Sequence, residues 1–328
     1  MSDSTKARLL HVANGTCTTD ILAASGIPGP RSIWADPLYE GPVPAGLNDD
    51  ELIDVRGRYL SGGADVEAVN DLRAWRRTIE AHEAYDELVL WYEHDLFDQL
   101  NLTQISSWLR NRLPRGKIVS LVCVGSFPGH PRFKGLGELS PDELASLFDT
   151  RHRISESEFD VAERAWQAFR EPAPQRLDSL RQADIAPMPY LAAALERFLQ
   201  EYPSTIDGLS RTERRLLQLA EPGPIPVADA FPRMHDEEDA YYITDLSLAG
   251  MVGTLSRTSP PLLTIVDGSP EAASLHGTVS LTDAGRDALG RRRDRVACGL
   301  DRWLGGVHLQ TGADIWRWDD ERRRITRR

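Results

Sequence analysis

The sequence predicts an α/β fold with a mostly parallel sheet, followed by smaller helical and α+β regions. Short, continuously apolar runs alternate with polar helical stretches over residues 8–125, the pattern of a parallel sheet that helices cover on both faces. The pattern changes after Asp207, where three amphipathic stretches precede two strand-like pieces. With 328 residues, the chain is also longer than one ordinary hydrophobic core requires. These observations indicate more than one domain.

Residues 1–150 are predicted to form a Rossmann-like domain. The apolar runs are short, and they lack the polar alternation of a strand with one exposed face. Thr16 or Thr18 is placed to cap the first helix, and Asn48 the second. The expected strands are 8–12, 31–35, 88–92 and 117–124, and the expected helices are 18–24, 48–61, 64–84 and 97–113.

A loop rich in glycine and proline, residues 125–143, follows the fourth expected strand. Its length and its turn residues are typical of a functional loop. Ser140 and Pro141 then open a helix as N-cap and first helical residue. Residues 151–206 continue as a helical connector, with helices near 155–170 and 188–201.

The element order over residues 207–298 is that of a winged helix. Ser210 is placed to cap the first of three helices, and Thr282 caps a fourth that follows a hairpin. The elements expected after the first helix are helices 227–231 and 241–255 and strands 262–266 and 277–281.

Residues 299–328 contain aromatic, β-rich pieces and a glycine-containing turn, which predicts a terminal hairpin with a basic tail. If exposed, its apolar side chains would form an unusually large patch. We therefore expect the hairpin to dock against the N-terminal domain, with Gly305 and Gly306 allowing a bend or a close backbone approach. His308 would then either approach the strand ends or serve only in packing.

Composition limits the class of protein. The formal net charge of −12 repels nucleic acid at long range. No apolar run approaches the roughly 20 residues of a membrane-spanning helix, and the N-terminus lacks the apolar core of a secretory signal. Three widely separated cysteines argue against a disulfide framework. We expect a cytoplasmic protein that does not bind membranes, and the sequence leaves a homodimer open.

The strongest functional signal is the triplet Glu93-His94-Asp95, directly after the third apolar run. Ligands and catalytic groups gather at the carboxyl ends of strands in open α/β sheets. His94 is the natural proton shuttle because its pKa lies closest to neutrality, and Glu93 or Asp95 would orient or stabilise it. In the alternative interpretation, the triplet is only the N-cap and first turn of the next helix, for which Asp95 is well suited.

The first apolar run ends in His11-Val12-Ala13-Asn14-Gly15-Thr16. The order strand, Asn-Gly-Thr, helix places main-chain N–H groups and the Thr16 hydroxyl at a helix N-terminus, where a carboxylate or phosphate can bind. Gly15 alternatively serves only to reverse the chain. We assign His11, Asn14 and Thr16 to substrate binding.

The second run ends in a stiff segment that carries Asp36 and Glu40. We expect Asp36 to be a catalytic carboxylate and Glu40 to bind substrate, although exposed acidic loops are also ordinary. In the 125–143 loop, Arg132 is expected to neutralise an anionic substrate and Lys134 is a second local cation; both could instead pair with neighbouring acids.

A divalent metal site is conceivable, because nitrogen and oxygen ligands suit several ions. No recognised ligand spacing supports it, so we assign no metal ligand, and the sequence does not identify a cofactor. The residues that such a site would draw on are His11, Asp36, Glu93, His94 and Asp95.

The winged-helix pattern raises the question of DNA binding. The helix that would read DNA follows four acidic residues, 236–239, and offers no Arg or Lys before Arg257. We expect this domain to serve in packing or protein contacts, and we do not expect it to bind DNA.

Four motifs taken together resemble a known family: HVANG, IWADPLYEGPVP, LWYEHDLFDQL and FPGHPRFKGLGELSPDEL. They are similar to the bacterial family catalogued as domain of unknown function 1835, and the second half of the chain is similar to the long form of that family. The resemblance covers nearly the whole chain and implies the same domain layout. Because the family has no assigned reaction, the resemblance implies no catalytic residue.

These observations favour an enzyme, of the hydrolase or transferase class, that acts on a small polar, anionic metabolite by acid–base chemistry at the strand ends. The other hypothesis is a regulator or adaptor whose pocket senses a small-molecule ligand and whose winged-helix-like domain makes protein contacts.

Overall fold

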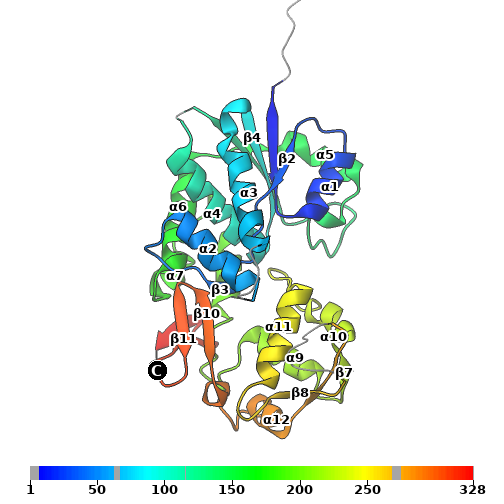
Figure 1. Cartoon of the computed structure of the whole chain (residues 1–328), viewed down its shortest axis with the longest axis vertical. Coiled ribbons are helices and arrows are strands. Elements are labelled where there is room, and N and C mark those ends of the chain that lie inside the picture. Colours follow the sequence, from blue (N-terminus) through cyan, green and yellow to red (C-terminus); the bar gives the residue numbers. More distant parts are fainter. Residues whose placement is uncertain (1–6, 63–66, 115, 268–274, 328) are drawn as a thin grey trace, which may run out of the picture.

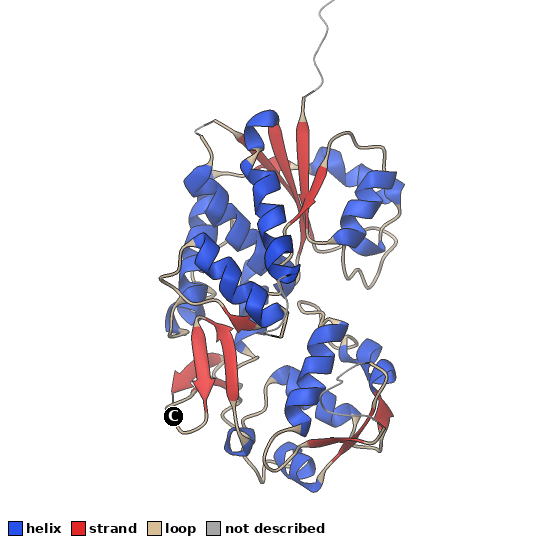
Figure 2. Ribbon diagram, viewed as in Figure 1, coloured by secondary structure: helices blue, strands red, loops and turns tan. Residues whose placement is uncertain are grey.

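The centre of the N-terminal part is a five-stranded sheet with the order β2-β1-β4-β5-β6, and its edge strand β6 lies just beyond residue 150, in the connector. The computed structural model describes residues 7–62, 67–114, 116–267 and 275–327. The first four strands in this order are parallel, and the edge strand β6 is antiparallel, so the predicted mostly parallel sheet is confirmed (Figure 2). The strands are β1 (Leu9–Ala13), β2 (Arg31–Ile33), β4 (Glu87–Glu93), β5 (Ile118–Val124) and β6 (His152–Arg153).

Helices cover both faces of this sheet (Figure 1). Alternate residues of β4 enter two separate cores: Leu90 packs in the larger cluster, and Trp91 packs in the smaller one with Leu22 and Leu144. This explains why the run is apolar throughout. Helices α1 (Thr16–Ala24) and α5 (Pro141–Leu147) lie on one face, and α2 (Asp49–Leu60), α3 (Glu67–Glu80), α4 (Leu96–Arg112) and α6 (Glu156–Arg170) lie on the other.

The predicted caps are partly confirmed. Asn48 and Ser140 each form a capping box with the glutamate three residues later. The prediction for α1 is wrong: its N-cap is Gly15, with no side-chain hydrogen bond, because Thr18 donates to Asn14 instead. Short 3₁₀ turns cover His82–Ala84, Leu136–Glu138, Phe148–Thr150 and Arg295–Cys298.

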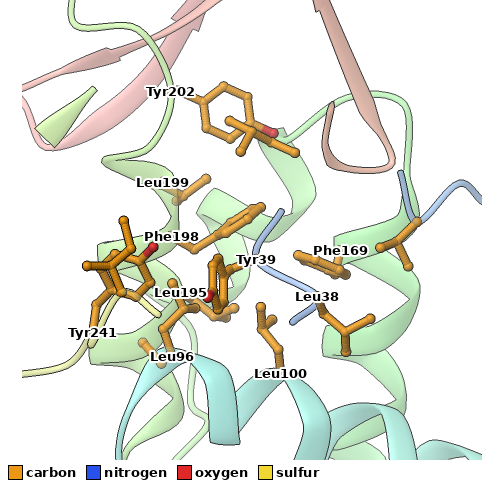
Figure 3. Packing of buried hydrophobic residues seen from close by; sticks show 14 of the residues in the cluster. Leu38, Tyr39, Leu96, Leu100, Phe169, Leu195, Phe198, Leu199, Tyr202 and Tyr241 are labelled. Carbon is orange, nitrogen blue, oxygen red and sulfur yellow. The ribbon is translucent and has the colours of Figure 1, made fainter. Parts of the chain in front are cut away.

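The apolar core extends from the sheet through the helical connector, residues 151–206, into the C-terminal region. It contains α7 (Gln175–Leu180) and α8 (Leu191–Leu199). Aromatic rings meet here: Phe169 lies 5.0 Å from Phe198, and Tyr39 lies 5.1 Å from Tyr241 between ring centroids (Figure 3). One cluster of buried apolar residues therefore extends from the sheet into the C-terminal region.

The C-terminal region, residues 207–298, contains helices in the predicted order around a three-stranded antiparallel sheet, β7-β9-β8. Its third helix begins four residues later than predicted, because Thr244 rather than an earlier residue caps it. The elements are α9 (Arg211–Leu219), β7 (Ile225–Pro226), α10 (Val227–Met234), α11 (Asp245–Ser256), β8 (Leu263–Ile265), β9 (Thr278–Leu281) and α12 (Asp283–Leu289).

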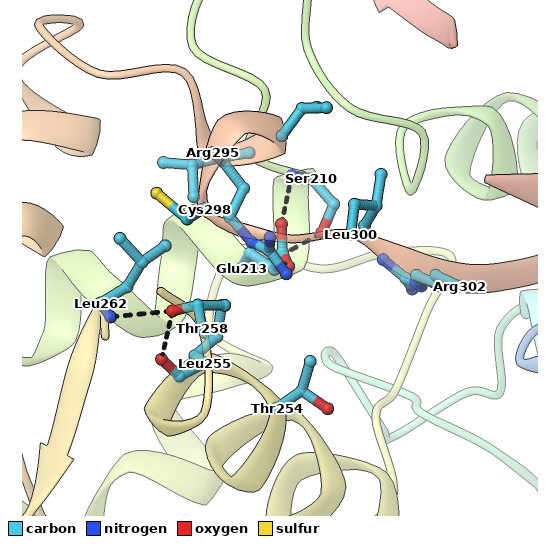
Figure 4. Close-up of polar contacts among 12 residues, drawn as sticks. Ser210, Glu213, Thr254, Leu255, Thr258, Leu262, Arg295, Cys298, Leu300 and Arg302 are labelled. Carbon is cyan, nitrogen blue, oxygen red and sulfur yellow. Dashed lines mark hydrogen bonds and ion pairs between the residues drawn. The ribbon is translucent and has the colours of Figure 1, made fainter. Parts of the chain in front are cut away.

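A buried ion pair between Glu213 and Arg295 joins α9 to the 3₁₀ turn at the end of this region (Figure 4). Glu213 accepts hydrogen bonds from the Ser210 N–H (3.0 Å) and from Arg295 Nε (3.1 Å). Thr258 bridges the end of α11 to β8, because its hydroxyl donates to the Leu255 carbonyl (2.9 Å) and accepts from the Leu262 N–H (3.1 Å). Glu213 and Arg295 thus form a link inside the protein, although charged side chains are mostly exposed.

The end of the chain forms two hairpins rather than one. The first docks on the N-terminal part, as predicted: Leu304 pairs with Gly41 in a parallel bridge, and the Val43 N–H donates to the Gly305 carbonyl (2.8 Å). His308 does not approach the strand ends; it is exposed, stacks on Trp303 and pairs with Asp301. The strands are β3 (Gly41–Pro42), β10 (Asp301–Gly305), β11 (Val307–Gln310), β12 (Trp316–Asp319) and β13 (Arg324–Arg327).

Within the described part of the chain, no helix has both the length and the apolarity that crossing a membrane requires.

The hairpin contact predicts the effect of one added methyl group. A Cβ at Gly306 would lie 1.9 Å from the Arg170 carbonyl oxygen. We expect Gly306→Ala to lower the free energy of unfolding by about 1–3 kcal/mol, since the backbone must shift to accommodate the methyl group. Gly250→Ala in α11 is the matched control, because an added Cβ there meets nothing within 4 Å. Urea denaturation measures both, and equal stability of the two variants would contradict a tight hairpin contact.

Candidate functional site

The carboxyl ends of β1 and β4 meet at one edge of the sheet, as parallel neighbours must. Asn14 follows β1 directly, Glu93 is the last residue of β4, and Asp98 lies in the first turn of α4. With His94, these residues make up what we call the strand-end site. Both strands run towards the C-terminal region (Figure 1).

Asn14 connects the two carboxyl groups. Its Nδ2 donates to Glu93 Oε1 and to both oxygens of Asp98, at 3.1 and 3.0 Å for the latter. Its Oδ1 accepts from the Thr18 hydroxyl at 2.7 Å, which fixes the amide with its nitrogen towards the acids. The predicted role of Asn14 in binding substrate thus competes with a role in holding the two acids.

Glu93 is also fixed by the 125–143 loop and by α4. Its Oε2 accepts from the Leu136 N–H at 2.6 Å, and its own N–H donates to Asp98 Oδ2 at 2.5 Å. A Cβ at Gly135 would lie only 1.9 Å from Oε2. The 125–143 loop therefore needs glycine at this position to reach the carboxyl group.

Burial raises the pKa of these acids. It is the main reason that the pKa of Glu93 rises to about 8, and the charge of Asp95 adds to the effect. Burial and the neighbouring Glu93 and Asp95 raise the pKa of Asp98 well above its ordinary value. Among the described residues, no Lys or Arg forms an ion pair with Glu93, Asp95 or Asp98. At neutral pH the cluster therefore retains a proton that it can donate as a general acid.

His94 is half-buried and surrounded by aromatic rings. The centroids of Phe133, Tyr190 and Tyr242 lie 6.4, 6.2 and 6.4 Å from its own. Its Nδ1 is buried and has no hydrogen-bond partner among the residues that the structure describes. Burial lowers the pKa of His94, against the opposite effect of the main chain and the charge of Asp239. A neutral imidazole with a free nitrogen can accept a proton.

Asp95 is the N-cap of α4. This agrees with the alternative interpretation, in which the triplet Glu93-His94-Asp95 only begins the next helix. Its Oδ1 accepts from the Asp98 N–H at 2.8 Å. Burial raises the pKa of Asp95 to about 7. Its charge acts on Glu93 and Asp98, so it influences the site without belonging to the hydrogen-bonded group around Asn14.

His11 does not lie at the strand ends. It is fully buried within β1 opposite Val89, four residues before the end of β4. Its Nδ1 accepts from Trp91 Nε1 and its Nε2 donates to the Pro28 carbonyl, both at 3.1 Å. With both ring nitrogens in use and burial lowering its pKa, His11 is a core residue, and its expected place in the pocket is wrong.

Asp36 also has a structural partner. It forms a buried ion pair with Arg56 (2.6 Å between Arg56 Nη2 and Oδ1), and Asn101 binds its main-chain groups. The Asp36 carboxylate is thus held by Arg56 and lies outside the hydrogen-bonded group around Asn14, and its catalytic assignment stays a prediction. Glu40 lies at the junction with the C-terminal region, where burial raises its pKa and Ser247 and Arg302 act in the opposite direction.

The remaining predicted binding residues are exposed. Thr16 is the first residue of α1, next to the uncapped N-terminus of that helix. Arg132 forms no ion pair with a described residue, whereas the Lys134 ammonium lies 6.0 Å from the centre of the Tyr242 ring. The structure thus brings together Asn14, Glu93 and Asp98 and leaves Thr16 and Arg132 at the surface.

Asp98, a residue of the site, and Tyr242, which contacts His94, were not predicted. The sequence does contain a signal for Asp98, because Asp95 and Asp98 have the spacing of an N-cap and its third helical residue. It contains none for Tyr242, since only the tertiary fold brings the C-terminal region to His94. Within the described residues, no group of three or more His, Cys, Asp or Glu side chains is arranged to hold a metal ion.

No model of a known protein family matches the chain, and no curated protein matches it significantly.

The role of Asp36 can be tested through stability. Asp36→Ala leaves the Arg56 charge buried without a partner, so we expect the free energy of unfolding to fall by about 3–5 kcal/mol. Asp54→Ala is the control, because it removes a half-exposed pair with Arg73 and should cost about 1 kcal/mol or less. If urea denaturation shows the same small loss for both, the buried pair is not the function of Asp36.

The raised pKa of Glu93 predicts a pH dependence. An unfolded glutamate ionises near pH 4.5, whereas folded Glu93 retains its proton up to about pH 8. Between these values the folded state binds more protons, so raising the pH favours unfolding. The stability of the wild type relative to Glu93→Gln should therefore decrease steadily from pH 5 to pH 8.

Asp86→Asn provides the control for this measurement. Hydrogen bonds from Arg8 lower the pKa of Asp86 below its ordinary value, and an arginine stays charged throughout this range. The contribution of Asp86 should therefore be constant from pH 5 to pH 8, since it is lost only as the pH falls through the folded pKa. Melting temperatures across this range provide the readout, and a Glu93→Gln difference that does not vary with pH would contradict the raised pKa.

Proposed function

We propose that the protein is a cytoplasmic enzyme that acts on a small polar, anionic metabolite by acid–base chemistry at the strand-end site. One observation supports this most: two buried carboxyl groups, Glu93 and Asp98, share one amide and have no cationic partner among the described residues. Buried acids with raised pKa values at the strand ends of an α/β sheet are typical of catalytic sites. A structural cluster would be stabilised by a cation, as Asp36 is by Arg56.

In this proposal Glu93 donates a proton to the substrate and His94 accepts one. Asp98 and Asn14 hold Glu93 in place, and the charge of Asp95 raises its pKa. The exposed start of α1, with Thr16, would receive the anionic group of the substrate, since helix N-termini favour anions. Arg132 would contribute a positive charge from the loop.

The layout that we propose is a Rossmann-like domain over residues 1–150 and a winged-helix-like domain over residues 207–298. The sheet order with parallel β2, β1, β4 and β5 supports the first, and the β7-β9-β8 sheet among four helices supports the second. The resemblance to the family catalogued as domain of unknown function 1835 is part of the same proposal.

One observation favours the alternative, a ligand-sensing regulator. The C-terminal region reaches the strand-end site, because the Leu96 N–H donates to the Ala240 carbonyl at 2.7 Å. A ligand bound at the site could thus alter the position of that region. The two functions differ in whether the bound compound is consumed.

The test begins with native mass spectrometry of the purified protein, which identifies a small molecule that stays bound to it. We expect the wild type to convert this compound and His94→Gln to convert it at least about 100-fold more slowly, the usual loss when a general base is removed. Binding should change little. His308→Gln, on the exposed face of the terminal hairpin, is the control and should retain full turnover. Tight binding without turnover by the wild type would refute the enzyme and favour the regulator.

A further inference from the structure

A segment of the C-terminal region, residues 235–244, lies against the strand-end site. The Ala240 carbonyl accepts the hydrogen bond of the Leu96 N–H, one of the free N–H groups in the first turn of α4. This contact adjoins Asp95, the N-cap of that helix. The main chain of Asp239 also lies close enough to His94 to act on its pKa.

Tyr242 is the aromatic residue of this segment that faces the site. Its ring meets the His94 ring edge-on, with 6.4 Å between centroids and an interplanar angle of 75°. Its neighbours in sequence, Tyr241 and Ile243, are buried and anchor the segment. On its other sides Tyr242 meets His235, at 5.7 Å between ring centroids, and the Lys134 ammonium.

The orientation of His94 depends on packing as well as on the main chain. Main-chain groups of Asp239 and Val124 act on the imidazole, whereas Nδ1 has no hydrogen-bond partner among the described residues. Three rings also surround the imidazole: Phe133 from the 125–143 loop, Tyr190 from the start of α8 and Tyr242 from the C-terminal region. Only Tyr242 comes from outside the N-terminal part and the connector.

We propose that Tyr242 is a positioning residue of the strand-end site, which packs against His94 and makes the 235–244 segment one wall of that site. That this site carries out chemistry rests on the proposed function. It follows that the C-terminal region completes the place where chemistry occurs. The charged groups that act on the two rings are Asp239, Asp95, Glu138 and Glu238 on the acidic side and Lys134 on the basic side.

The test follows the titration of the His94 imidazole by NMR in the full chain, without substrate. His94→Gln assigns the signal. Tyr242→Ala opens the His94 ring to water, so its pKa should rise towards the ordinary value of about 6.5. Tyr242→Phe retains the ring and should leave the titration unchanged. Tyr85→Ala is the matched control: it removes a half-buried tyrosine just before the opposite end of β4 and should leave His94 unchanged.

Tyr242→Leu keeps the experiment decisive if the alanine variant does not fold, because it removes the ring but retains apolar volume. We expect a smaller rise in the same direction. An unchanged His94 titration in the folded variants that lack the ring would overturn the proposal. This result is distinct from failure of the proposed function, which would appear as unchanged turnover in His94→Gln while Tyr242→Ala still shifts the titration.

Discussion

Glu93 holds together three segments that the chain brings to the end of β4. Its carboxyl group accepts from Asn14 after β1 and from the Leu136 N–H in the 125–143 loop, and its main-chain N–H donates to Asp98 in α4. Gly135 allows the loop to approach this carboxyl group closely, because it has no Cβ. Replacing Glu93 by any shorter side chain would therefore release the loop as well as change the charge. The same group sets the local architecture and carries the proposed chemistry.

Two kinds of buried acid occur within a short distance along the sheet edge, and they differ in their partners. Asp36 is neutralised by Arg56, which also binds the Pro37 and Glu40 carbonyls, so that pair fastens a loop to α2. Among the described residues, Glu93 and Asp98 have only neutral hydrogen-bond donors, and burial raises the pKa of both carboxyl groups. Burying acids without a cationic partner costs free energy. This cost is what supports the proposed chemistry at Glu93 and Asp98, in addition to the structural links that Glu93 makes.

The sequence predicts the sheet and the location of the site well, because both depend on local pattern. Apolar runs that stop at polar residues mark the strand ends, and the acids at 93 and 95 lie where predicted. The edge strand β6 is missed because it has two exposed residues and no apolar pattern. His11 is misplaced because a parallel strand buries both faces, so a histidine inside it can be satisfied by Trp91 and the Pro28 carbonyl. The hydrogen-bond partners of a buried polar residue depend on the tertiary structure, so a local sequence pattern cannot predict them.

The acidic run 236–239 shows how a charge pattern acquires its meaning from the fold. In the sequence it argues only against DNA binding. In the structure Glu238 pairs with the buried Arg197 of the connector at 2.8 Å and with Arg211 at 3.2 Å, and Glu237 pairs with Arg215. Arg197 in turn lies over the Tyr241 ring, at 4.5 Å from its centroid. These contacts fix the start of the 235–244 segment on the connector, and the next residues deliver Ala240 to α4 and Tyr242 to His94. The acids on which the prediction about DNA rests are thus the ones that hold this region against the strand-end site.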